Sequence, residues 1–371
     1  MLRILLVFGL ILTAPAIAQE TPPPAKPASA PAQYAPPPAM PAPAPAQLAT
    51  QQAEPAEPQP APIRVQVNEV IVPVTVTDYK DRFISNLEKT DFKIFENGRE
   101  QKIRYFSREH NQPVVVGFVL DLSSGSRLHW KNYQDTAMEL VWILLSDDKS
   151  IKYSGFLVTY STETELAVNT TSDAAAIVER IRKLKPGGGS ALFDAIYQAI
   201  TKHNMIKGEP IEPRRVLIVM GDGKDNASKH TMEEVLELAQ RDLVTIYGVS
   251  TTGFGFNSEG DDSLRRLCED TGGRVEYPLQ GVYKDVDGYL SKPQDAGNYS
   301  LTVGSGEYAS AISKGMFDAV AAVAGEVTTQ YILRYVPDTT DTKQFRNVHV
   351  VVNVPDAKVR ARRGYYPFAP K

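Results

Sequence analysis

The sequence predicts an α/β fold: a doubly wound, mostly parallel sheet flanked by helices, inserted into a small β-sandwich-like domain. Between residues 111 and 328, apolar strand-like runs alternate with amphipathic helical segments, which is typical of a parallel sheet. Residues 63–110 and 329–367 instead alternate apolar and polar side chains, as strands with one buried face do. Neither end segment has enough strands to be stable alone, so we expect the two to form one β domain.

Composition limits the kinds of partner and cofactor. The chain has 371 residues, 42% hydrophobic and 23% charged, which suits about two ordinary globular domains. Its formal charge of -4 gives it no basic footprint for phosphate backbones, so nucleic acid is not an expected partner. A single cysteine, Cys268, excludes an internal disulfide and any cysteine-based zinc or iron–sulfur site. We expect Cys268 to be a small core residue on an apolar helix face.

Residues 1–18 have the pattern of a secretory signal peptide. Arg3 precedes an apolar run at residues 4–12, and Ala16-Ile17-Ala18 forms a small-x-small cleavage site. The apolar run is short for a membrane-spanning helix, which needs about 20 residues. We therefore expect cleavage after Ala18, a secreted or periplasmic (cell envelope) protein, and no integral membrane span afterwards. An uncleaved anchor is the alternative interpretation.

Residues 19–62 are a Pro/Ala-rich linker, with proline at 15 of the 44 positions. Such a composition favours an extended, polyproline-like coil over a helix or a ladder. The segment is either a spacer through a cell envelope or a solvated tail.

The pattern of residues 63–110 predicts strands. Valines alternate from Val65 to Val76, and a hairpin is expected at residues 91–106 around Asn97-Gly98. Asn-Gly accepts the positive φ angles of a type I′ turn.

The α/β region predicts strands and helices in alternation. The run at residues 114–120 is apolar throughout, as expected of a strand buried on both faces. The other expected strands are residues 153–159, 216–220, 243–249 and 274–277. The expected helices are residues 132–145, 172–184, 191–202, 232–241, 262–271 and 314–328. Residues 279–313 interrupt this rhythm and are expected to be an insertion.

Oxygen-bearing side chains gather where ligands bind in such sheets, at the carboxyl ends of the strands. Asp121, Ser123 and Ser126 follow the first strand, Ser190 ends a glycine-rich loop, and Asp222 follows the strand at residues 216–220. Two carboxylates with hydroxyls and water suit a hard cation with octahedral oxygen ligands, namely Mg²⁺ or Mn²⁺.

The order and spacing of these residues resemble a von Willebrand factor type A (VWA) domain with its metal-ion-dependent adhesion site (MIDAS). The pattern of that family is Asp-x-Ser-x-Ser after the first strand, a Thr in a Gly-rich loop and an Asp after the fourth strand. Residues 156–160, 187–195 and 267–273 resemble the same family. The Asn-Gly hairpin and the ending at residues 362–366 resemble the exported VWFA-related subgroup common in Acidobacteria.

The sequence departs from the family pattern at the metal ligands. Gly125 stands at the second serine position, with a hydroxyl one residue later at Ser126; Ser190 replaces the threonine; and Gly221 precedes Asp222 where a Thr or Ser is usual. If Ser126 reaches the metal, the ligand set is complete. If it does not, water fills that position.

The resemblance implies a Rossmann-like VWA fold and a non-catalytic adhesion module. In this interpretation Mg²⁺ (or Mn²⁺) binds Asp121, Ser123, Ser126, Ser190 and Asp222, and an Asp or Glu of a protein partner completes the coordination. A structural scaffold of an envelope or surface assembly, with a degenerate metal site, is the alternative.

Catalytic alternatives have little support. The chain has neither a Gly-x-Ser-x-Gly elbow nor a complete phosphate-binding loop. A hydrolase within residues 278–313 is the remaining enzymatic hypothesis. The cluster of Arg360, Arg362 and Arg363 is expected to be a solvated strand end.

Overall fold

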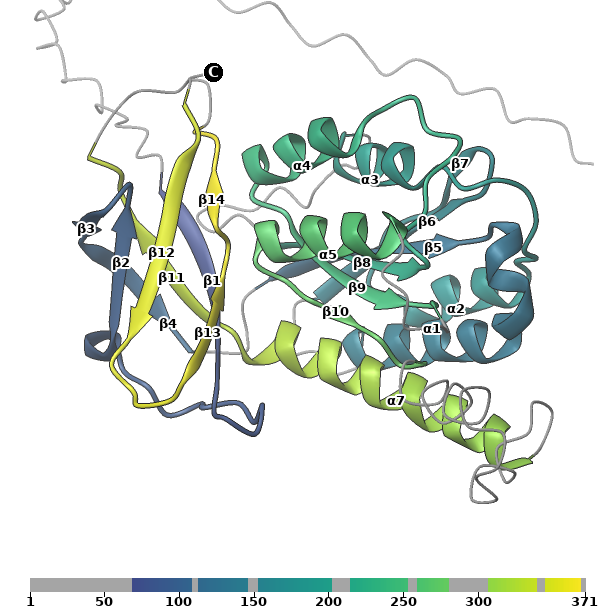
Figure 1. Cartoon of the computed structure of the whole chain (residues 1–371), viewed down its shortest axis with the longest axis horizontal. Coiled ribbons are helices and arrows are strands. Elements are labelled where there is room, and N and C mark those ends of the chain that lie inside the picture. Colours follow the sequence, from purple (N-terminus) through teal and green to yellow (C-terminus); the bar gives the residue numbers. More distant parts are fainter. Residues whose placement is uncertain are drawn as a thin grey trace, which may run out of the picture. The chain divides into compact units, whose positions relative to one another are not determined.

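The computed structural model describes residues 69–108, 113–145, 153–201, 214–252, 259–279, 306–338 and 344–367 (Figure 1). All of these belong to one compact unit, residues 64–371. The expected signal peptide, the linker at 19–62 and residues 280–305 of the expected insertion lie outside the described residues.

A six-stranded sheet with the order β10-β9-β8-β5-β6-β7 forms the centre of the α/β region. Its middle strand, β5 (Val114–Asp121), is buried along its whole length and pairs in parallel with β6 (Tyr153–Tyr160) and β8 (Arg214–Gly221). On the far side of β8, β9 (Thr245–Ser250) pairs with β8 in parallel, and β10 (Val275–Glu276) pairs in parallel with β9. The continuous apolar runs are thus explained by burial on both faces.

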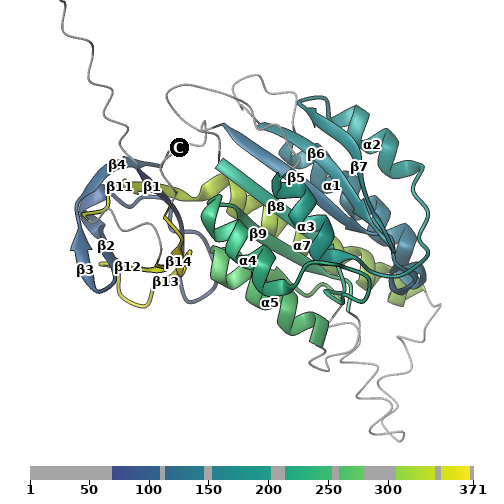
Figure 2. The same cartoon turned by 90° about the horizontal axis from the view of Figure 1, so that it is seen from above.

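Helices cover both faces of this sheet, as a doubly wound fold requires (Figure 2). One face packs against α1 (Trp130–Leu144), α2 (Ala174–Arg182) and α7 (Gly306–Thr329). The other face packs against α3 (Leu192–Thr201), α4 (Met232–Arg241) and α5 (Glu259–Thr271). Cys268 is a buried core residue of α5, as expected.

Local capping explains where two of these helices begin. The Asp173 side chain accepts hydrogen bonds from the backbone at the start of α2, and Thr231 and Glu234 form a capping box at the start of α4. Among the described residues, no helix combines the length and the apolar character that crossing a membrane requires.

Strands from the two ends of the chain form two further four-stranded sheets among the described residues. The first has the order β13-β1-β11-β4 and the second the order β14-β12-β2-β3. The N-terminal strands are β1 (Val70–Thr77), β2 (Phe92–Glu96), β3 (Arg99–Gln101) and β4 (Ile103–Ser107). The C-terminal strands are β11 (Tyr331–Tyr335), β12 (Arg346–Val352), β13 (Lys358–Ala361) and β14 (Gly364–Tyr365).

The inner faces of these two sheets share one apolar core. Val72 and Ile94 from the N-terminal strands pack in the same cluster as Leu333 and Val350 from the C-terminal strands. β1 pairs with β11, and β2 pairs with β12, so each sheet combines strands from both ends. The predicted fold class is therefore confirmed.

Three details differ from the expectations. The hairpin turn at Asn97-Gly98 has the expected positive φ angles, but its second strand ends at Gln101, and β4 crosses to the other sheet to pair with β11. The antiparallel edge strand β7 (Thr164–Thr171) was not predicted, because its half-exposed threonines lack a strong apolar alternation. Helix α7 begins at Gly306, inside the expected insertion.

Candidate metal site

Three loops meet at the carboxyl-end edge of the central sheet. Asp121 ends β5 and Asp222 directly follows β8, its paired neighbour, so the two acidic residues are brought together by the strand register. The glycine-rich loop is tied to the loop after β5, because Ser124 N donates to the Gly188 carbonyl at 3.0 Å. It is tied to the third loop by Asn226 N, which donates to the Ser190 carbonyl at 2.8 Å.

Asp121 is fully buried at the base of this site. Its Oδ1 accepts a hydrogen bond from Ser123 N at 2.6 Å, whereas its Oδ2 has no donor among the described residues. Burial raises the pKa of Asp121 to about 6, and the like charge of Asp222 adds to that rise, while hydrogen bonds from Ser123 oppose it. A buried carboxylate oxygen without a donor fits a bound cation.

Asp222 and Ser190 are held by the loop that follows β8. The Asp222 Oδ1 accepts from Lys224 N at 3.0 Å, and the Lys224 ammonium lies 3.9 Å from Oδ2. The buried Ser190 hydroxyl donates to the Lys224 carbonyl at 2.7 Å. Its proton is therefore occupied, while its lone pairs are left for another partner.

Ser123 and Gly125 face the carboxylates. A Cβ atom at residue 125 would lie 3.2 Å from Asp222 Oδ2 and 3.5 Å from Ser123 Oγ. A serine at residue 125, as in the family pattern, would therefore place its side chain among the candidate ligands, and Gly125 leaves that position without a hydroxyl.

Ser126 is engaged with its own turn. Its buried hydroxyl donates to the Ser123 carbonyl at 2.8 Å, and its backbone N–H contacts the same carbonyl. Coordination of a metal by Ser126 stays a prediction, and it can use only the hydroxyl lone pairs while this bond persists.

The structure adds Tyr160, which the sequence reasoning missed. Tyr160 ends β6, is buried, and its hydroxyl has no hydrogen-bond partner among the described residues. Burial first, then the charge of Asp121, raises the pKa of Tyr160 well above its usual value, so the phenol stays protonated. A Cβ atom at Gly221 would lie 2.5 Å from this hydroxyl and 3.2 Å from Asp121 Oδ2. The Tyr160 hydroxyl therefore fills the space that a Thr or Ser side chain at residue 221 would need.

We expect Gly221→Ala to lower the free energy of unfolding by about 1–3 kcal/mol, because the new methyl overlaps the Tyr160 hydroxyl. The Tyr160→Phe/Gly221→Ala double variant should recover part of this loss, since removing the hydroxyl relieves the overlap. Urea unfolding of the wild type, both single variants and the double variant forms the mutant cycle. Additive effects of the two changes would contradict the pairing.

The donor set suits a hard cation. Asp121, Asp222, Ser123 and Ser190 offer only oxygen, which Mg²⁺ and Mn²⁺ prefer. In the part of the chain that the structure describes, no group of three or more His, Cys, Asp or Glu side chains forms a metal cluster. Any ion here depends on two carboxylates supplemented by hydroxyls and water.

Comparison with known proteins agrees with the α/β fold of the central region. Residues 116–280 match the model of the von Willebrand factor type A domain. VWA domains are typically non-catalytic modules that bind protein ligands, often through a divalent cation at a MIDAS. No curated protein matches the chain.

The solved structures that match this chain have low sequence identity and low TM-scores. An aerotolerance-related membrane protein from Bacteroides fragilis NCTC 9343 is 14% identical with a TM-score of 0.36, over 48% of this chain and 99% of that one. BatB from Bacteroides thetaiotaomicron is 18% identical with a TM-score of 0.34, over 48% and 98%. Proximal thread matrix protein 1 from the mussel byssus, described with a zinc-occupied MIDAS motif, is 17% identical with a TM-score of 0.37, over 46% and 42%. Likenesses this low carry no argument about function.

Proposed function

We propose that this chain is an exported adhesion module whose VWA domain recognises a protein partner through Mg²⁺ or Mn²⁺. Asp121, Ser123, Ser190 and Asp222 would hold the ion, with Ser126 or a water at the position that Gly125 leaves open. The observation that carries this proposal is the fully buried Asp121 carboxylate, whose Oδ2 has no donor among the described residues, beside Asp222 on the neighbouring strand.

Charge decides what completes the site. The two carboxylates balance a divalent cation, and the serine hydroxyls add neutral oxygen ligands. A carboxylate from a partner then adds one negative charge at an open coordination position and binds the cation directly. Such an interaction forms and breaks no covalent bond, which suits a binding module.

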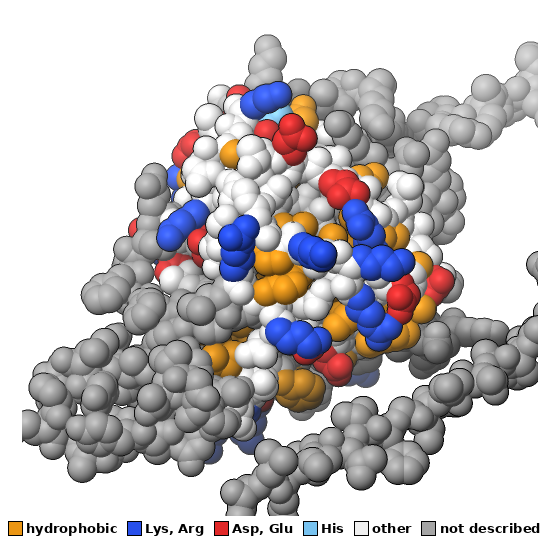
Figure 3. Space-filling model, turned by 90° about the vertical axis from the view of Figure 1, so that its right-hand side faces the viewer, with side chains coloured by type: hydrophobic (Ala, Val, Ile, Leu, Met, Phe, Trp, Pro, Cys, Tyr) orange, Lys and Arg blue, Asp and Glu red, His pale blue; other side chains and the backbone are white. Residues whose placement is uncertain are grey.

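The surface around the loops favours an acidic partner. Arg127, Lys183 and Lys185 are exposed beside the glycine-rich loop and make no ion pair within the described residues. The Arg127 guanidinium lies against this loop, with Nε 3.4 Å from the Pro186 carbonyl. Figure 3 looks onto this edge of the sheet and shows Lys and Arg side chains gathered on the face. Carboxylates that flank the metal-bound one would meet these cations.

A labelled hexaglutamate peptide tests this function, with hexaglutamine as the uncharged control. We expect hexaglutamate to bind in Mg²⁺ or Mn²⁺ and to bind at least tenfold more weakly in EDTA. Arg127→Gln/Lys185→Gln should weaken binding while leaving its metal dependence intact. Equal binding with and without the metal would remove the proposal and leave a purely electrostatic surface.

A metal-independent scaffold is the second candidate. Two observations favour it: Gly125 removes a ligand from the site, and the Lys224 ammonium already lies 3.9 Å from Asp222. The Mg²⁺ dependence of folding and of hexaglutamate binding separates the two candidates.

Gly125→Ser should restore the missing ligand and raise Mg²⁺ affinity by about tenfold, or about 1.4 kcal/mol. The added Cβ fits if the half-buried Asp222 shifts by a few tenths of an ångström. Gly125→Ala is the matched control, because it adds the carbon without the oxygen. An equal change in affinity for the two variants would show that the hydroxyl does not reach the ion.

Export is part of the proposal and has its own test. The signal pattern at residues 1–18 supports it, as does the resemblance of the hairpin and the C-terminal ending to an exported VWFA-related subgroup. We expect N-terminal sequencing of envelope or secreted material to give a mature chain that begins at Gln19. Full-length chain found only in the cytosol would contradict export.

A further inference from the structure

Two arginines are buried where the β-sandwich meets the VWA domain. Arg362, between β13 and β14, is 1% exposed, and Arg214, at the start of β8, is 8% exposed. The expectation that Arg362 lies on a solvated strand end is therefore wrong. Its neighbours Arg360 and Arg363 differ from it, because both pair with carboxylates of the VWA domain.

The hydrogen bonds of these two arginines are incomplete. Arg362 donates from Nη2 to the Leu243 carbonyl at 2.9 Å, but its Nε and Nη1 have no acceptor among the described residues. Arg214 donates from Nη1 to the Val327 carbonyl at 3.2 Å and from Nη2 to Gln330 Oε1, and its Nε has no acceptor there. Neither guanidinium forms a salt bridge with a carboxylate in the described part of the chain.

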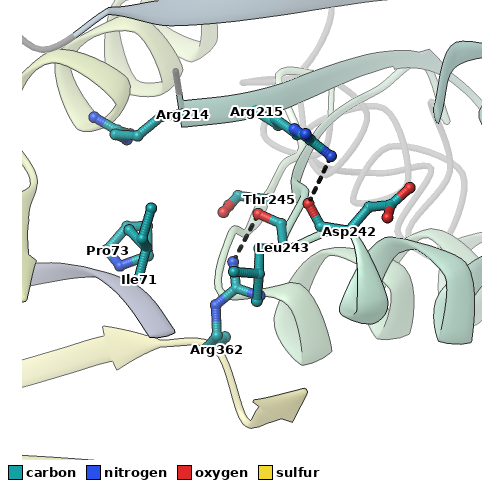
Figure 4. A pocket seen from close by; sticks show the side chains of 8 residues that line it. All are labelled: Ile71, Pro73, Arg214, Arg215, Asp242, Leu243, Thr245 and Arg362. Atoms are coloured by element: carbon teal, nitrogen blue, oxygen red, sulfur yellow. Dashed lines mark hydrogen bonds between the residues drawn. The ribbon is translucent and has the colours of Figure 1, made fainter. Parts of the chain in front are cut away.

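Both residues line one small cavity of about 20 Å³, and the Arg214 side chain points away from Arg362 (Figure 4). Arg215 also lines it, with Nη1 3.4 Å from the Asp242 carbonyl. The Asp242 carboxylate points away from Arg214 and Arg362. The apolar part of the lining comes from Ile71, Pro73 and Leu243.

Unpaired charge in such a place is costly. Burial lowers the pKa of Arg362 to about 10 and also lowers the pKa of Arg214, yet both remain protonated at neutral pH. The nearby buried carboxylate, Glu326, is already paired with Arg274 and Arg360. A buried cation without a counter-charge is strongly destabilising, so the unpaired Arg362 guanidinium favours the binding of an anion.

We propose that this cavity binds one small monovalent anion of the size of chloride, held by the free Nε and Nη1 N–H groups of Arg362. The volume supports this choice, because a cavity of roughly 10–15 Å³ already accepts a particle the size of water. Sulfate, phosphate and carboxylates are polyatomic and need more room. Such an ion would balance the buried Arg362 charge where the β-sandwich meets the α/β region, independently of the metal site.

Thermal melting of the full chain in NaCl and in sodium gluconate at equal ionic strength tests the proposal. Gluconate is too large for the cavity, so we expect only chloride to raise the melting temperature, by about 3 °C per tenfold increase above the dissociation constant. Arg362→Met should abolish this dependence, whereas the exposed-site control Arg363→Met should retain it. Equal melting in the two salts for the wild type, or a chloride effect that persists in Arg362→Met, would overturn the proposal.

Bromide provides a readout that does not depend on a variant folding. Crystals of the wild type soaked in NaBr should show an anomalous peak in the cavity beside Arg362. An ordered water without anomalous signal at that position would show that solvent alone satisfies Arg362, and the anion site would be rejected.

Discussion

Replacing Glu96 with alanine is expected to lower the free energy of unfolding by about 3–5 kcal/mol. Glu96 ends β2, is buried, and binds three side chains of the C-terminal strands. It accepts hydrogen bonds from Tyr335 at 2.6 Å and Tyr365 at 2.8 Å, and it pairs with the buried Arg346 at 3.0 Å. The truncation removes the Glu96 carboxylate that pairs with Arg346 and accepts from both phenols.

Urea unfolding followed by circular dichroism measures this effect. Glu100→Ala, at an exposed position of β3, is the matched control and should change stability by less than about 0.5 kcal/mol. Glu96→Gln should lower the free energy of unfolding by less than Glu96→Ala does, because the amide oxygen can still accept one of the hydrogen bonds. A loss below about 1 kcal/mol for Glu96→Ala would contradict a sandwich closed by this network across the two ends of the chain.

The second large effect is expected at Asp121. Without metal, Asp121→Asn should stabilise the protein at pH 7.5 by about 2 kcal/mol, because it removes a buried charge beside Asp222. The pKa of Asp121 is raised to about 6 in the folded state, so its stabilising contribution is present at low pH and is lost as the pH rises through 6. The advantage of the variant in EDTA should therefore be small near pH 4 and larger above pH 6.

Metal should reverse this order. A hundredfold excess of Mg²⁺ over its dissociation constant should stabilise the wild type by about 2.7 kcal/mol, or roughly 5 °C in melting temperature, and leave Asp121→Asn unchanged. The exposed-site control Asp262→Asn should respond to Mg²⁺ as the wild type does. A wild-type melting temperature that is the same in EDTA, Mg²⁺ and Mn²⁺ would favour the scaffold.

Most of the fold can be predicted from the sequence, because the order of apolar and polar residues along each strand indicates which of its faces are buried. The continuous apolar run of β5 predicts a strand buried on both faces, and Asn97-Gly98 predicts a hairpin turn. Because ligand sites lie at the carboxyl ends of the strands, Asp121 and Asp222 are expected to lie close together. Strand β7 was missed because an edge strand with half-exposed threonines has little apolar pattern.

Side-chain environments could not be predicted in the same way. The Tyr160 hydroxyl reaches the space beside Gly221 only because β6 and β8 flank β5 in the sheet, which is a tertiary relation. Arg362 has the same local sequence character as Arg360 and Arg363, yet it alone of the three is enclosed at the domain junction. The hydrogen bond from Ser126 to the Ser123 carbonyl likewise depends on the turn geometry that the loop adopts.

Isothermal titration calorimetry of the purified chain with MgCl₂ and MnCl₂ tests the central claim most directly. Metal-dependent recognition predicts one ion bound per chain, lost in Asp121→Asn and tightened in Gly125→Ser. The absence of saturable binding of either ion to the wild type at millimolar concentration would contradict it.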